Sequence, residues 1–119
     1  LLGLVWLLIT VPLGVLTLTF GVYLAKKSMV LVFHNETGGV IDWGVYGYVR
    51  HPMYLAIALI LLGFAISTLS LLAFIVLAAF LLFLDRMATY EEHDLTRMLG
   101  QQYTDYQKRV PKWLPTKRK

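Results

Sequence analysis

Two clusters of polar side chains border apolar stretches of this chain, and both contain groups that can do chemistry. The first cluster is the run Gly44-Val45-Tyr46-Gly47-Tyr48-Val49-Arg50-His51-Pro52-Met53-Tyr54, which directly precedes a long apolar segment. The second is the pair Glu91-Glu92, which follows another apolar stretch. Ionisable side chains are expensive to keep at a membrane boundary, so their presence indicates a binding or catalytic function.

Pro52 predicts a helix that begins at that residue, because proline is well tolerated at the first helical position. His51 then lies near the N-cap, and the free amides from Met53 onward point back toward the preceding loop. The partial positive charge of this helix start, together with donors from Arg50 and His51, can bind a carboxylate or a phosphate. A simpler alternative stays open, in which Arg50 extends to lipid headgroups and the tyrosines form an interfacial belt.

Both carboxylates of the second cluster lie on the side of a helix that is meant to be buried. In a helix predicted over residues 87–99, Glu91 and Glu92 fall within about 60° of the centre of the apolar face. A solvated helix would show the reverse arrangement. We therefore expect each carboxylate to meet a basic side chain, a helix terminus or a ligand. The purely structural alternative is a salt bridge to Arg50 or Arg86.

The tail after this helix carries further candidates. Gly100 can end the helix, Tyr103 and Tyr106 share one face of the next helix, and Pro111 stops that helix. Arg109 can form a forked clamp on a carboxylate or phosphate of a substrate. The aromatic and basic residues of the tail also suit a segment at the level of the lipid headgroups.

The composition is that of a membrane protein. Of the 119 residues, 58% are hydrophobic and only 15% are charged. The absence of cysteine excludes disulfides, a thiolate metal site and a cysteine nucleophile, and we predict no metal site. The net charge of +4 fits membrane topology and attraction to anionic lipid, with Lys117-Arg118-Lys119 contributing, better than it fits nucleic-acid binding.

We expect an all-α, integral-membrane protein with about three transmembrane helices. Residues 1–25 are uncharged and predict a spanning helix, with a possible kink at Pro12. Residues 26–52 form a loop, residues 53–86 a tight helical hairpin that breaks at 67–70, and residues 87–119 a helical tail. A single helix or a re-entrant segment over the hairpin residues stays open as an alternative.

The basic residues orient the chain. Lys26, Lys27 and Arg50 flank the middle loop, eight basic residues follow Leu84, and the turn at residues 67–70 has none. By the positive-inside rule, the loop and the tail face the cytoplasm. A signal peptide is disfavoured because no basic segment precedes the first run. The chain begins without Met, so we expect a fragment or processed product with helices upstream.

Five pieces of sequence occur in an order and spacing that resemble a known family. They are Gly44-Val45-Tyr46, Arg50-His51-Pro52-Met53-Tyr54, Glu91-Glu92, Gly100 with Tyr103 and Tyr106, and Arg109-Val110-Pro111 through Leu114-Pro115. They look like the C-terminal core of the isoprenylcysteine carboxyl methyltransferase family, and the related phospholipid methyltransferases share much of it. The resemblance covers residues 38–115.

This resemblance implies an integral-membrane methyltransferase that uses S-adenosylmethionine and acts on a lipophilic acceptor, such as the carboxylate of an isoprenylcysteine-like substrate. The implied cofactor-binding residues are Gly38, Gly39, Val40, Ile41, Tyr46, Arg50, His51, Pro52, Met53, Tyr54 and Glu91. Arg109 would lie toward the substrate, and Arg109 or Arg86 would position an acidic acceptor. Glu92 would support Glu91. If the acceptor is an amine, the candidate base is Glu92, His51 or a tyrosine.

The chain also departs from the family pattern. Ala56 stands where a glycine usually follows the motif. Met87 aligns with an arginine that faces substrate in the eukaryotic prenylcysteine enzymes, and Arg86 is one residue away. This departure concerns recognition of a prenylcysteine carboxylate more than it concerns the cofactor.

Two other classes of protein stay open. Sterol reductases carry a segment similar to Arg50-His51-Pro52 and a similar tail, which would make this chain an NADPH-dependent reductase. Alternatively, the chain is a noncatalytic membrane subunit whose polar residues only anchor and pair. The pair Glu91-Glu92 and the run Arg109-Val110-Pro111 favour the methyltransferase.

Overall fold

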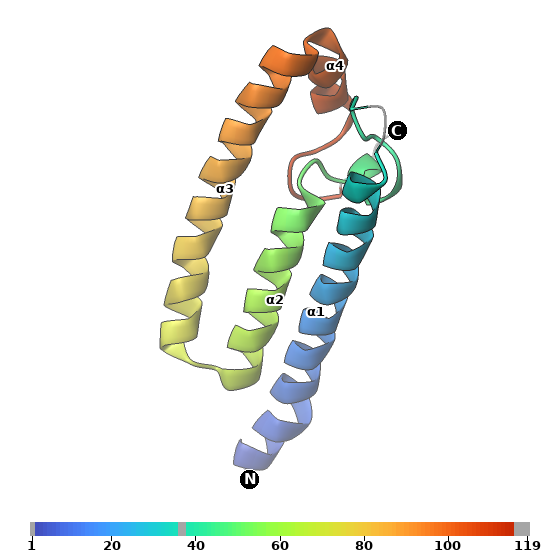
Figure 1. Cartoon of the computed structure of the whole chain (residues 1–119). Helices are drawn as coiled ribbons and strands as arrows, with labels where there is room; N and C mark the ends of the chain where they lie inside the picture. The colour runs from blue at the N-terminus through green and yellow to red at the C-terminus, as the bar shows by residue number, and fades with distance from the viewer. Residues whose placement is uncertain (1, 36–37, 116–119) are drawn as a thin grey trace.

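The computed structural model describes residues 2–35 and 38–115, and every regular element in these residues is helical. In chain order the elements are α1 (Leu2–Phe33), the short 3-10 helix η1 (Gly44–Gly47), α2 (Pro52–Thr68), α3 (Leu71–Leu99) and α4 (Gln101–Arg109). Figure 1 shows α1, α2 and α3 running lengthwise, with α4, η1 and the segment from the end of α4 to residue 115 gathered at the end opposite to the N-terminus. The all-α fold class is thus confirmed. The basic residues 117–119 lie outside the described residues.

The first helix is longer than the uncharged run predicts. We expected it to end at residue 25, but α1 continues to Phe33 and carries Lys26 and Lys27. Lysine is a good helix former, and no glycine or proline follows until Gly38, so two charges do not end the helix. The helix also continues through Pro12. The loop before η1 is correspondingly shorter than expected.

Small residues allow α1 and α2 to pack closely along their length. A Cβ atom built on Gly63 would lie 2.5 Å from the carbonyl oxygen of Gly14 and 2.6 Å from the amide of Leu18. One heptad beyond Gly14, a Cβ atom on Gly21 would lie 3.0 Å from the carbonyl oxygen of Ala56. Small residues at such spacing bring membrane helices into backbone contact. This contact fixes α2, and with it the first polar cluster, against α1.

The hairpin breaks where the sequence predicts. Thr68 ends α2, Leu69 adopts the left-handed conformation with φ 49°, and Ser70 caps α3 by accepting a hydrogen bond from the amide of Ala73 over 3.2 Å. A serine at this position is among the best N-caps. The single-helix alternative for this segment is therefore wrong.

The third helix passes through the boundary that we expected between hairpin and tail. We placed a break after residue 86, but α3 is continuous from Leu71 to Leu99 and joins both parts in one element. It ends at Gly100, which has φ 64° and whose amide donates to the carbonyl of Thr96 over 2.8 Å. As expected, α4 then ends before Pro111.

Two of these helices, α1 and α3, are long and apolar enough to cross a membrane. At about 1.5 Å per residue, each exceeds the hydrocarbon thickness of about 30 Å. The apolar helix α2 is shorter, with 17 residues. The count of three spans therefore stays a prediction.

We predict that Gly63→Ala destabilises the helix pair, because the added methyl group would overlap with backbone atoms of α1 at 2.5 and 2.6 Å. The expected loss is about 1–3 kcal/mol of unfolding free energy, the usual cost of overpacking, measured by denaturant titration in detergent. Gly3→Ala is the control, since a Cβ atom there meets nothing within 4 Å. Equal stability of the two variants would contradict the packing described here.

Candidate active site

Arg50 and Glu92 form a buried ion pair that joins the start of α2 to α3. The Nε atom of Arg50 donates to Oε2 of Glu92 over 3.0 Å, and its Nη2 atom donates to Oε1 over 3.4 Å. The Nη1 atom donates to the carbonyls of Gln107 at 3.0 Å and Val110 at 3.3 Å. The side chain of Gln107 adds a third donor to Glu92, at 3.2 Å. The salt bridge considered as an alternative for Glu92 is thus present.

His51 occupies the N-cap of α2 and lies between the two carboxylates. Its Nε2 atom is 2.5 Å from Oε2 of Glu92, and its Nδ1 atom is 3.7 Å from Oε1 of Glu91, which is an ion-pair distance. The ring also stacks on Tyr54, with centroids 5.8 Å apart. Only 4% of His51 is exposed, so its polar atoms depend on these partners.

Burial and charge shift the pKa of His51 in opposite directions. Burial of the imidazole lowers the pKa, but the two carboxylates raise it by more, so it lies above the usual 6.5. For Glu92, burial raises the pKa, and the contacts with His51 and Arg50 lower it by more. The contact with His51 also lowers the pKa of Glu91. These shifts favour a protonated imidazole held between two ionised carboxylates.

Glu91 is the more accessible carboxylate of the pair. Its side chain is 52% exposed, whereas that of Glu92 is 11% exposed. The hydroxyl of Tyr54 donates to Oε2 of Glu91 over 3.2 Å. Because Glu92 is enclosed by three donors and Glu91 is half open, Glu91 is the carboxylate that a ligand can reach.

The segment after α4 folds back over the start of α2. The amide of Arg50 donates to the carbonyl of Pro111 over 2.9 Å. The ring of Trp113 lies on the ring of His51, with centroids 5.6 Å apart, and its Nε1 atom donates to Asp85 on α3 over 2.8 Å. The C-terminal segment therefore covers His51 and ties it to α3.

A small apolar core lies between α4 and the loop before η1. Tyr103, Tyr106 and Val110 are buried together, and Val40 from the loop before η1 packs against them. The hydroxyl of Tyr106 donates to the carbonyl of Tyr46 over 2.6 Å. Burial, with a smaller effect of Glu91, raises the pKa of Tyr46 to about 12. Tyr46 is therefore a neutral hydrogen-bonding group at physiological pH.

The structure brings five of the predicted site residues together, and they are Arg50, His51, Tyr54, Glu91 and Glu92. Pro52 and Met53 form the first turn of α2 beside them. The loop residues Gly38, Gly39, Val40 and Ile41 run along α4, where the amide of Val40 donates to Gln102 over 3.2 Å.

The two predicted substrate arginines lie on the surface. Arg109 is 58% exposed at the end of α4, with Nη2 3.5 Å from Oδ2 of Asp42. Arg86 is exposed on α3. Their roles toward a substrate stay predictions.

Sequence reasoning missed three residues that complete the cluster. Gln107 is one helical turn beyond Tyr103, so it lies on the helix face that Tyr103 and Tyr106 share. That position could have indicated that Gln107 faces the interior. Trp113 was interpreted only as a headgroup anchor. Asp85 accepts from Trp113 and lies 3.0 Å from Lys112, and no spacing within α3 indicates these partners.

We predict that Glu92→Gln destabilises the fold, because it leaves the Arg50 guanidinium buried without its counter-charge. Removing one partner of a buried pair costs about 3 kcal/mol, which denaturant titration in detergent would measure. Arg97→Ala on the exposed side of α3 is the control, because Arg97 pairs there with Asp94 on the surface. If Glu92→Gln is as stable as that control, the pair does not hold the fold.

The pKa shifts of His51, Glu91 and Glu92 predict that their contribution to stability is greatest in mildly acidic solution. The raised pKa of His51 contributes stability that is complete below pH 6.5 and is lost as pH rises through its folded pKa. The lowered pKa values of Glu91 and Glu92 contribute stability that is complete above pH 4.5 and is lost as pH falls. The maximum contribution therefore lies between these two values.

The pH dependence of thermal unfolding, followed by tryptophan fluorescence in detergent, checks this expectation. His51→Gln should remove the loss of stability on the alkaline side, while His93→Gln, at an exposed position of α3, should leave the profile unchanged. An alkaline limb that persists in His51→Gln would show that another group causes it.

The sequence of this chain is similar to those of known methyltransferases. The family model described as phospholipid methyltransferase matches residues 4–102. Protein-S-isoprenylcysteine O-methyltransferase of Mus musculus is 31% identical over 114 residues, covering 86% of this chain and 40% of the relative. Protein-S-isoprenylcysteine O-methyltransferase B of Arabidopsis thaliana is 31% identical over 90 residues, covering 73% of this chain and 45% of the relative.

The chain thus spans less than half the length of these curated relatives. No solved structure matches it significantly. The family model covers most of the chain, including both polar clusters. The chain therefore belongs to the family of phospholipid and isoprenylcysteine methyltransferases, as its motifs predicted.

Proposed function

We propose that this protein is a multi-pass membrane methyltransferase that transfers the methyl group of S-adenosylmethionine to a lipophilic acceptor carboxylate. The observation that carries the proposal is the difference in accessibility between the two carboxylates. Glu92 is buried and bonded to Arg50, His51 and Gln107. Its neighbour Glu91 lies beside the start of α2, and half of its side chain is exposed to solvent. Family membership supports methyl transfer as the reaction.

The chemistry of the donor set fits S-adenosylmethionine. Glu91 can accept hydrogen bonds from the ribose hydroxyls or the amino group. The amides of Met53 and Tyr54, in the first turn of α2, have no carbonyl partner within the helix and can hold the cofactor's carboxylate. Nearby, His51 adds a positive charge. When bound, the cofactor would supply an electrophilic methyl group for in-line displacement.

The loop before η1 would form another part of the pocket. We assign Gly38, Gly39, Val40 and Ile41 to the cofactor, together with Tyr46. In support, this loop is anchored on α4 through Val40, and Tyr46 is tied to Tyr106. Gln107 of the same helix donates to Glu92. The loop and the Glu92 carboxylate are therefore both attached to α4.

The electrostatics of the cluster favour an acidic acceptor over an amine. An amine must lose a proton before it can attack, and the candidate bases are Glu92, His51 and a tyrosine. The raised pKa values of Tyr46 and Tyr54 keep both tyrosines protonated at neutral pH. The lowered pKa of Glu92 and the raised pKa of His51 make these two residues poor bases at neutral pH as well. A carboxylate is already ionised and needs only positioning, for which Arg109 and Arg86 are the candidates.

A lipophilic acceptor would reach this site from the bilayer. The positive-inside rule places the loop and the tail, and hence the site, at the cytoplasmic face. The apolar part of α3 between Leu71 and Leu84 would lie in the membrane, with Glu91 two turns beyond it. A prenylated or similar lipid-like substrate could then keep its chain in the bilayer while its carboxylate is methylated.

We predict that the full-length protein binds S-adenosylhomocysteine in isothermal titration calorimetry and does not bind NADPH. Glu91→Gln should weaken this binding about tenfold or more, because it removes a charge-assisted hydrogen bond from an accessible position. Arg97→Ala, on the same helix, should bind like the unchanged protein.

Three outcomes would contradict the proposal. Binding of NADPH alone would indicate a reductase, and binding of neither compound to well-folded protein would indicate a noncatalytic subunit. Equal weakening in Glu91→Gln and Arg97→Ala would remove Glu91 from the cofactor site.

A further inference from the structure

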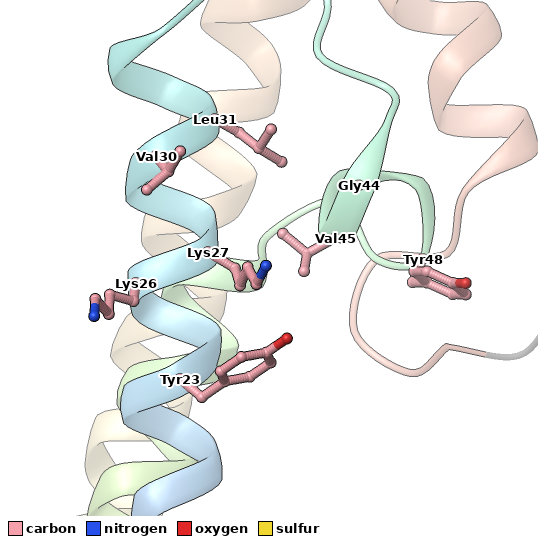
Figure 2. A pocket seen from close by; sticks show the side chains of 8 residues that line it. All are labelled: Tyr23, Lys26, Lys27, Val30, Leu31, Gly44, Val45 and Tyr48. Carbon is pink, nitrogen blue, oxygen red and sulfur yellow. The ribbon is translucent and has the colours of Figure 1, made fainter.

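Two cavities differ in where they lie along the long helices. The larger one has a volume of 610 Å³ and lies between the last turns of α1 and η1 (Figure 2). Its apolar lining residues Val30 and Leu31 follow Lys27, so they lie beyond the uncharged run of α1. The smaller one has a volume of 490 Å³ and lies between α2 and α3, beside the turn that joins them. The smaller cavity is therefore the one that lies among apolar runs, at the end of the hairpin that is opposite to α4 (Figure 1).

The lining of this smaller cavity suits a hydrocarbon chain. None of its lining residues carries a charge. Its two hydroxyl groups are already engaged, because Thr68 donates to the carbonyl of Phe64 over 3.0 Å and Ser70 caps the start of α3. The volume falls in the range of about 300–1,000 Å³ that is usual for small-molecule sites. An occupant of this cavity therefore needs no polar group.

The cavity is open toward the side where the bilayer would lie. Phe64 of α2 and Leu72 of α3 both line it, and they are 58% and 69% exposed. At the level of the apolar part of α3, exposed side chains of a membrane protein contact acyl chains. A hydrocarbon chain can therefore enter the cavity from the side without passing through water.

A stripe of residues on α2 leads from this cavity to the proposed cofactor site. Thr68 and Leu61 line the cavity, and Tyr54 continues the same spacing of seven residues. Residues at this spacing lie two helical turns apart on nearly the same face. The hydroxyl of Tyr54 donates to Glu91, the more accessible carboxylate, over 3.2 Å. The stripe therefore ends at the open edge of the site.

A second stripe on α3 runs between the same two points. Leu77 lines the cavity, and Leu84 and Glu91 follow it at spacings of seven residues. Leu77 and Leu84 are 8% and 4% exposed, so this face of α3 is turned inward. The two stripes meet at the cavity and again at the hydrogen bond of Tyr54 with Glu91, so they face each other. We call the contact line between them the α2–α3 seam, formed by Tyr54, Leu61 and Thr68 with Leu77, Leu84 and Glu91.

We propose that the α2–α3 seam binds the lipophilic chain of the methyl acceptor, with the far end of the chain in the cavity between Leu61 and Leu77. This inference rests on the proposed function, since it takes the acceptor to be a lipophilic carboxylate. The carboxylate end of the acceptor lies near the open edge of the cofactor site, and its chain follows the two apolar stripes away from it.

The geometry of the seam makes it selective for chain length. At about 1.5 Å per residue, Leu61 and Thr68 lie about 10 Å and 21 Å from Tyr54 along α2. The turn that follows Thr68 closes the seam at its far end. A short chain ends at the entrance of the cavity, whereas a longer chain fills it. The seam therefore favours acceptors whose chain extends about 20 Å from the site, which corresponds to about 17 bonds at about 1.2 Å per bond.

Methylation of two acceptors of different length by the full-length protein in detergent tests the proposal. N-acetyl-S-hexylcysteine and N-acetyl-S-dodecylcysteine extend about 11 Å and 18 Å from the carboxyl carbon, at about 1.2 Å per bond. Ala73→Phe fills the cavity and should lower kcat/KM for the dodecyl acceptor about tenfold, the low end of the effect of altering a hydrophobic pocket. It should leave kcat/KM for the hexyl acceptor unchanged.

Ala78→Phe is the matched control for this substitution. Ala78 is exposed on the same helix and does not line the cavity, so both acceptors should react as they do with the unchanged protein. The two acceptors partition differently into detergent, but this difference cancels when each variant is compared with the unchanged protein for the same acceptor.

A diazirine at the end of the dodecyl chain locates the chain in the unchanged protein. We expect its photolabel, mapped by mass spectrometry, on residues 61–77, and we expect excess unlabelled dodecyl acceptor to remove it. Labelling needs binding but no methyl transfer. It therefore decides the question even if Ala73→Phe does not fold.

The proposal is overturned if folded Ala73→Phe loses both acceptors equally or loses neither, because the far end of the chain then does not lie in the cavity. A photolabel on these residues that excess acceptor does not remove would also overturn it, since the cavity would then take any hydrocarbon chain of the surroundings. If the unchanged protein methylates neither acceptor, the proposed function fails, and the photolabel alone then decides whether the seam binds the chain.

Discussion

The ion cluster around Glu92 is the interaction on which the rest of this structure depends. One carboxylate receives donors from the segment before α2 and from α4, while it is itself carried by α3. Burying these charges is costly, and the cost is offset because each oxygen of Glu92 has strong partners. The same arginine also ties down two carbonyls at the end of α4. A single residue thereby brings together three parts of the chain that are far apart in sequence.

The elements that local chemistry determines could be predicted from the sequence. Pro52 predicted His51 at the N-cap, and the turn rich in serine and threonine predicted the break of the hairpin. Gly100 and Pro111 predicted the two ends of α4. The end of α1 could not be predicted in the same way. Lys26 and Lys27 mark where an apolar run stops, but charged residues end a membrane span and not a helix. The same distinction explains why α3 passes Asp85 and Arg86 without a break.

The candidate site was predictable in composition but not in arrangement. The helical periodicity put Glu91 and Glu92 on one buried face, and Arg50 was named as a partner. The sequence does not show which of the two glutamates is buried. This depends on how α4 and the chain after it fold back over the site, which tertiary contacts determine. Gln107 and Trp113 acquire their roles only through that return of the chain. Their residue types alone are equally typical of a solvated helix or of an interfacial anchor.

The continuity of α3 makes the geometry of the site sensitive to the thickness of the bilayer. The segment that would lie in the hydrocarbon and the turn that carries Glu91 and Glu92 belong to one uninterrupted rod. A helix adapts to a thicker or thinner membrane by changing its tilt. Since α2 is packed tightly on α1 through its glycines, such a tilt moves α3 relative to His51. The lipid composition of the host membrane would thus set the separation of the carboxylates from the imidazole between them.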